Sequence, residues 1–119
     1  MKCLRIEPKK KPEVVDIPND LKSFQKEVGG YIEVIYPFTD MVGIICNEEG
    51  KLLNLPENRI LRDSHGIPYD VICGNFLVVG LDEDDFIDLS DKYIKKYSKI
   101  FADEMWKDGE IPHPPFLTA

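Results

Sequence analysis

The chain has 119 residues, of which 31% are charged and 43% are hydrophobic, a composition typical of a globular protein rather than a disordered one. A chain of this length forms one domain without needing a metal or a disulfide to hold its core. Its formal net charge of -7 argues against direct, sequence-independent binding to nucleic acid, which requires clustered Lys and Arg.

Three widely spaced cysteines, Cys3, Cys46 and Cys73, each lie in an apolar run that is typical of a strand. An odd count at this spacing favours buried free thiols in a reducing cytosol over a disulfide framework. No window has the length of a membrane span, and the N-terminus lacks the apolar segment of a signal peptide. The sequence therefore predicts a cytoplasmic protein with no membrane contact.

Short strands and one helix are predicted in the first part of the chain. Residues 1–7 and 13–17 alternate in polarity and predict two strands of a hairpin. A helix follows in which Asn19 is the expected N-cap and Gly29 closes the C-terminal end. Residues 31–36 form the clearest alternating strand, and their odd and even positions are expected to face opposite sides of a sheet.

The next segment combines an apolar run with many polar side chains. Residues 41–47 predict a strand, and residues 51–53 predict a second short strand after a turn. Gly50 is expected to take the positive backbone dihedral of this turn, so the pattern predicts a β-hairpin. Residues 58–63 fit either a further strand or an irregular connection.

A long β-rich run and a longer helix are predicted in the last part. Residues 69–80 form the run, with Gly74 at a bulge or bend. The acidic segment 81–90 has no glycine, which argues against an EF-hand calcium loop. Ser90 is expected to cap a helix that extends to about Trp106.

Together these elements predict one α+β domain over residues 1–119, with a mainly antiparallel or mixed β-sheet covered by two helices. The pattern does not give the order of the strands. Residues 109–119 form a Pro-rich C-terminal tail that is expected to be extended or to contact another subunit. The tail with Phe116, together with the Met105 and Trp106 pair, predicts a homo-oligomer.

The sequence favours binding over catalysis. Nucleophilic catalysis needs a Ser or Cys beside a His base, but His65 lies in a predicted turn and His113 lies in the Pro-rich tail. Neither histidine has partners at the spacing of a metal site, and the adjacent carboxylates of Glu48 and Glu49 are expected to be solvated. No catalytic residue, metal site or cofactor is therefore predicted.

Four motifs resemble a known family. They are GGYIE at residues 29–33, NEEGK at 47–51, NR at 58–59 and CGNF at 73–76. Over nearly the whole chain, these motifs resemble the small family from tailed phages and bacterial mobile elements that is catalogued as domain of unknown function 3846. The resemblance implies a phage or plasmid accessory protein in the cytoplasm of a bacterial host cell, often encoded among genes that blunt host defence. It supplies no catalytic residue.

The first functional hypothesis is that the protein binds and sequesters a small nucleotide-derived immune signal without altering it. Arg59, Lys51 and Arg62 would bind phosphates. The other predicted ligand residues are Asn47, Asn58 and Asn75 for base or ribose edges, and Tyr31, Tyr69 and Phe76 for stacking on the base. For any single residue a structural role is favoured, in which Arg59 pairs with an acidic neighbour and the aromatic rings belong to the core.

The second hypothesis assigns the function to the acidic surface. Residues 82–91, with a sequence pI near 4.8, would imitate a phosphate backbone and bind a host defence protein such as a restriction enzyme. A single acidic loop is a small surface for such a mimic, because a good mimic would carry carboxylates along much of its surface. Salt separates the two hypotheses, because mimicry weakens steeply above about 0.15 M salt, where the Debye length is roughly 8 Å.

Overall fold

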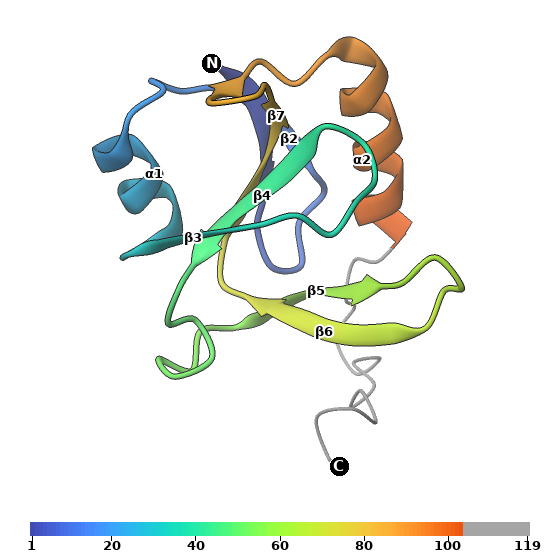
Figure 1. Ribbon diagram of the computed structural model, residues 1–119. Coiled ribbons are helices and arrows are strands. Elements are labelled where there is room, and N and C mark those ends of the chain that lie inside the picture. Colours follow the sequence, from blue (N-terminus) through green and yellow to red (C-terminus); the bar gives the residue numbers. More distant parts are fainter. Residues whose placement is uncertain (104–119) are drawn as a thin grey trace.

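An antiparallel β-sheet lies between two helices in the computed structural model, which describes residues 1–103 (Figure 1). The strand order of the main sheet is β2-β1-β7-β4-β3, and the short strand β8 pairs with the end of β7. The elements are β1 Lys2–Ile6, β2 Glu13–Asp16, α1 Leu21–Val28, β3 Ile32–Ile35, β4 Val42–Asn47, β7 Phe76–Leu81, β8 Phe86–Ile87 and α2 Asp91–Asp103. The predicted α+β class, with a sheet covered by two helices, is confirmed.

Alternation along the central strands creates a hydrophobic core on each face of the sheet. On β1, Leu4 packs in the core with α2, whereas Cys3 packs in the core with α1. On β4, Ile44 and Ile45 divide between the two cores in the same way. Because successive side chains of a strand point to opposite faces, strands covered on both faces are apolar at nearly every position. This explains the unbroken apolar runs of β4 and β7.

Capping side chains fix where the helices begin. Asp20 is the N-cap of α1, and its Oδ1 accepts a 2.8 Å hydrogen bond from the amide three residues further on. The prediction of Asn19 as the cap is therefore wrong by one residue. The side chain of Asn19 instead donates a hydrogen bond from Nδ2 to the carbonyl oxygen of Phe86 at 2.9 Å. The predicted caps at Ser90 and Gly29 are confirmed: the Ser90 hydroxyl accepts from α2 at 3.4 Å, and Gly29 has a φ of 79°.

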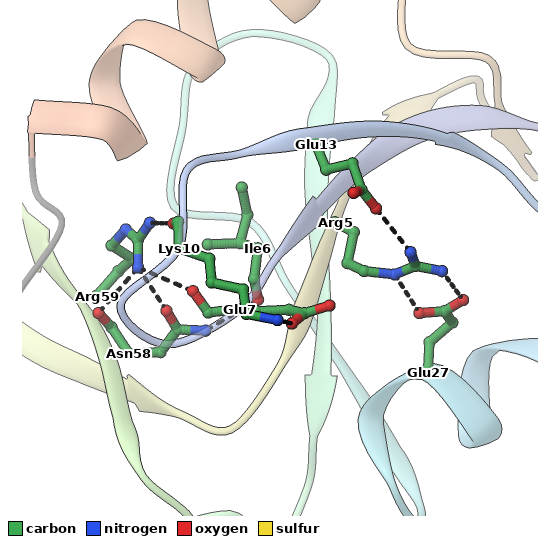
Figure 2. Close-up of polar contacts among 8 residues, drawn as sticks. All are labelled: Arg5, Ile6, Glu7, Lys10, Glu13, Glu27, Asn58 and Arg59. Carbon is green, nitrogen blue, oxygen red and sulfur yellow. Dashed lines mark hydrogen bonds and ion pairs between the residues drawn. The ribbon is translucent and has the colours of Figure 1, made fainter.

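An ion pair fastens α1 to the main sheet (Figure 2). Nε and Nη2 of Arg5 on β1 donate to the two carboxylate oxygens of Glu27 on α1, at 2.8 Å and 2.6 Å. Glu13 on β2 accepts a third hydrogen bond from Arg5 at 2.8 Å. The hydrogen bonds to Glu27 are the main reason that the pKa of Arg5 lies above its ordinary value, so the guanidinium stays charged.

The predicted hairpin over residues 41–53 is wrong. Strand β4 pairs with β3 and β7, and residues 48–54 form consecutive turns in which the Leu53 amide donates to the Glu49 carbonyl at 2.9 Å. Gly50 does not have a positive φ. A glycine is required there for a different reason, since a Cβ would lie 2.6 Å from the carbonyl oxygen of Cys73.

Strands β5 (Glu57–Arg62) and β6 (Pro68–Cys73) form a separate two-stranded sheet (Figure 1). Residues 58–63, for which the sequence allowed a strand or an irregular connection, are therefore mostly strand. Leu61 and Ile72 pack in the same core as α2. The bend predicted at Gly74 is confirmed: with a φ of 86° it lies where the chain leaves β6 and enters β7 of the main sheet.

Several predictions concern residues 104–119, which are outside the described residues. They include the end of the last helix at Trp106, the Pro-rich tail and the placement of His113. The homo-oligomer rests on Met105, Trp106 and Phe116, and it stays a prediction.

We expect Gly50→Ala to destabilise the fold more than Gly29→Ala. At Gly50 the new methyl group overlaps the Cys73 carbonyl oxygen, so backbone must move, at a cost of roughly 3 kcal/mol. At Gly29 no atom lies within 4 Å, and the left-handed conformation alone costs about 1 kcal/mol. Urea unfolding measures both losses. Equal losses would contradict the close approach at Gly50.

Candidate functional site

The nine residues predicted to bind a ligand do not converge on one pocket. Asn47, Asn58, Arg59 and Phe76 are buried; Tyr31, Lys51, Arg62 and Tyr69 are exposed; Asn75 is half-buried. Asn47 and Lys51 line a crevice between the main sheet and β6. Tyr31 and Asn47 line a separate hollow beside the end of α1. Ligand binding by this set stays a prediction, and the described geometry distributes its members over several parts of the fold.

The Arg59 guanidinium lies in the protein interior, with 0% of the residue exposed (Figure 2). Its Nε donates to the carbonyl oxygen of Phe101 in the last turn of α2 at 2.7 Å, and its Nη2 donates to that of Lys10 at 2.6 Å. Nη1 donates to the side-chain oxygen of Asn58 at 2.7 Å and to the Glu7 carbonyl at 3.3 Å. Main-chain and side-chain oxygens therefore surround this buried cation.

Asn58, also 0% exposed, completes this polar cluster. Its Nδ2 donates to the carbonyl oxygen of Ile6 at 2.9 Å and to that of Gly74 at 2.8 Å. Together Asn58 and Arg59 tie four segments to β5: the end of β1, the β1–β2 loop, the β6–β7 bend and the end of α2. The contacts of Arg59 described here are thus structural, and they go to main-chain carbonyls and Asn58, whereas the structural role considered from the sequence was a pair with Glu48 or Glu57.

The crevice between β3, β4 and β6 has a volume of about 210 Å³. Its charged lining consists of the carboxylates of Glu33, Glu48 and Asp70 and the ammonium of Lys51. Lys51 Nζ forms an ion pair with Asp70 at 2.5 Å. Because carboxylates outnumber cations, this lining disfavours a phosphate. Neither Asp70 nor Glu33 is among the residues predicted from the sequence to bind a ligand. For Glu33 the sequence does hold a signal, because this acidic residue shares a strand face with apolar side chains.

A second hollow, of about 430 Å³, lies where β7 runs into the acidic loop. Residues 82–85 give it four consecutive carboxylates. Tyr36 and Met41 line it as well, although they are 67% and 56% exposed. The hollow therefore combines negative charge with large apolar side chains that remain open to solvent.

The thiols lack the properties of a catalytic nucleophile. Cys3 and Cys46 are buried, and burial raises the pKa of Cys3 to about 11 and that of Cys46 to about 12. The prediction of a buried thiol is wrong for Cys73, which is half-buried because it lines the crevice. Burial also raises its pKa. Thiolate, the reactive form, is therefore scarce at neutral pH at all three positions.

Residues 1–103 contain neither a cluster of potential metal ligands nor a helix that could cross a membrane. No group of three or more His, Cys, Asp or Glu side chains in this part of the chain is placed to hold a metal ion. No helix described there has the length and apolar character required to cross a bilayer. His65 is exposed in the turn between β5 and β6, where its amide donates to Asp63 at 2.8 Å.

We expect Arg59→Ala to lower the free energy of unfolding by at least about 3 kcal/mol. The truncation leaves the buried oxygens of Phe101 and Asn58, and the part-buried oxygen of Lys10, without this donor; each unsatisfied buried group costs about 1 to 3 kcal/mol. The matched control is Arg62→Ala at the exposed end of β5, for which we expect a change within about 0.5 kcal/mol. Urea unfolding compares the two variants, and similar stabilities would contradict the structural role of Arg59.

We expect Cys73 to be the first thiol to react with a chromogenic thiol reagent in the native protein. Because its pKa lies above the ordinary value, the rate should rise about tenfold per pH unit between about pH 7 and 8.5. Cys3 and Cys46 should react only on unfolding. In Cys73→Ser the native-state phase should disappear, and rapid labelling of that variant would contradict the burial of the other two thiols.

Comparison with known proteins identifies the family of the chain. No curated protein and no solved structure matched it. The family model described as Domain of unknown function (DUF3846) matches residues 1–102, which include every strand and all but the last residue of α2. The chain therefore belongs to the family Domain of unknown function (DUF3846).

Proposed function

We propose that this protein acts by binding rather than by catalysis, and that its acidic surface binds a positively charged surface of a partner protein. The observation that carries the proposal is the charge of the two hollows described above. In the crevice three carboxylates accompany one ammonium, and four carboxylates line the hollow at the acidic loop. Such surfaces attract basic partners and repel anions.

Exposed apolar groups beside the acidic loop support contact with a protein. Tyr36 and Met41 lie in the hollow formed by residues 82–85. Aromatic residues and methionine are enriched at protein interfaces, where they supply contact area, while charges around them steer the encounter. This combination fits a macromolecular partner better than a free ion.

Sequestration of a nucleotide-derived signal is the second candidate, because Asn47 and Lys51 do line the same crevice. Its support is weaker in two respects. Arg59, the expected phosphate contact, is buried among main-chain carbonyls, and Lys51 is already paired with Asp70. The crevice is also smaller than the roughly 300 Å³ at which ligand pockets commonly begin.

The biological setting is part of the proposal. The resemblance implies a phage or mobile-element protein in the bacterial cytoplasm, so the partner would be a host defence protein such as a restriction enzyme.

The test starts with proteins that the purified chain captures from a bacterial lysate. Each captured protein is identified, purified alone and titrated against the chain at about 0.05 M and about 0.3 M salt. We expect a partner with a basic surface whose affinity falls at least tenfold at the higher salt. Binding that is indifferent to salt would contradict the proposal.

A charge-neutralised pair of variants tests the acidic loop itself. Glu83→Gln with Asp84→Asn should weaken binding of the purified partner about tenfold at low salt. The matched control, Glu13→Gln with Asp16→Asn, removes the same charge from β2, which does not line the acidic hollow, and should have little effect. If heating the chain instead releases an intact nucleotide, the second candidate is supported; a cleaved product would show an enzyme.

A further inference from the structure

Strand β3 is an edge of the main sheet, and among the described strands only β4 pairs with it. The Glu48 amide donates to the Tyr31 carbonyl at 2.9 Å, which makes these two residues a hydrogen-bonded pair. In an antiparallel ladder such pairs alternate with pairs whose main-chain groups point outward. The N–H and C=O groups of Ile32 and Val34 therefore point away from the sheet, where they can pair with another strand.

Both acidic hollows adjoin this edge strand. Glu33 and Ile35 on β3 line the crevice, whereas Tyr36, the next residue along the chain, lines the hollow at the acidic loop. Carboxylates therefore lie beside β3 in the crevice and near its C-terminal end in the second hollow. Tyr31 and Tyr36, each 67% exposed, stand at its two ends.

The opposite edge of the sheet is different in charge. Glu13 on β2 is paired with Arg5, and Asp16 is paired with the N-terminal ammonium at 2.8 Å. Carboxylates that already have cations attract a further cation less strongly. Of the two edges of the main sheet, β3 is the one that selects a basic partner by charge.

We propose that β3 is the docking edge for an extended, Lys- or Arg-rich segment of a partner protein, which adds a strand to the main sheet. This inference rests on the proposed function and specifies its binding mode. Main-chain hydrogen bonds to Ile32 and Val34 hold the segment, and alternate side chains reach the two faces of the sheet. Basic side chains on the crevice side meet Glu33. Pro37 ends the edge, so the paired segment is short.

The test uses a defined probe, an eight-residue capped peptide of alternating Lys and Val. It is compared with two versions in which the main-chain nitrogens are methylated at either the odd or the even positions. Alternate amides of a strand face the same neighbour, so one methylated series blocks pairing with β3 and the other leaves it intact. We expect affinity to fall at least tenfold for one series and less than about threefold for the other.

Two further readouts locate the peptide on the chain. Hydrogen exchange at the Ile32 and Val34 amides should slow at least tenfold in the complex. Glu33→Gln should weaken binding severalfold, whereas Glu13→Gln on the opposite edge should not. Because both substitutions are at exposed positions, they should leave the fold intact.

The outcomes separate this inference from the proposed function. If both methylated peptides bind as well as the parent and binding still falls with salt, the acidic surface binds by charge alone and docking on β3 is overturned. If neither the peptide nor any basic partner protein binds, the proposed function fails together with the inference. Protection of amides on β2 in place of β3 would also overturn the inference.

Discussion

The buried guanidinium of Arg59 constrains several parts of this structure that are distant in the chain. A charge in the protein interior is costly unless hydrogen-bond acceptors surround it, and here the acceptors come from the β1–β2 loop, Asn58 and the end of α2. The small β5–β6 sheet is thereby held against the main sheet and α2. Its position in turn creates the crevice beside β3, so an interior interaction determines the shape of the exposed surface.

Local features of the fold could be predicted from the sequence because they depend on neighbouring residues. The alternation of residues 31–36, the cap at Ser90 and the bend at Gly74 are of this kind. Strand pairing was not predictable in the same way. The sequence predicts the turn after Asn47, but β4 pairs with β3 and β7 and not with residues 51–53, and β7 is brought there by the tertiary fold.

The candidate site shows the same limit. Arg59 and Asn58 lie in a polar segment, and polar residue types usually indicate surface. Their burial depends on acceptors distant in the chain, such as Phe101, which lies 42 positions from Arg59. The crevice could not be predicted from the sequence either, because Glu33 and Asp70 come to line it only when the two sheets pack together. Composition nevertheless gave the sign of the surface charge correctly, since net charge does not depend on the fold.

The place of β7 in the sheet has a consequence for synthesis on the ribosome. The hairpins β1–β2 and β3–β4 emerge early, but in the described sheet they are joined by β7, the last long strand and the centre of the sheet order. Until about 80 residues have left the exit tunnel, β1 and β4 each expose an apolar edge that a nascent chain must keep from pairing with its neighbours. Insertion of β7 closes both edges in one step. We therefore expect chaperone dependence to be concentrated in the interval before β7 emerges.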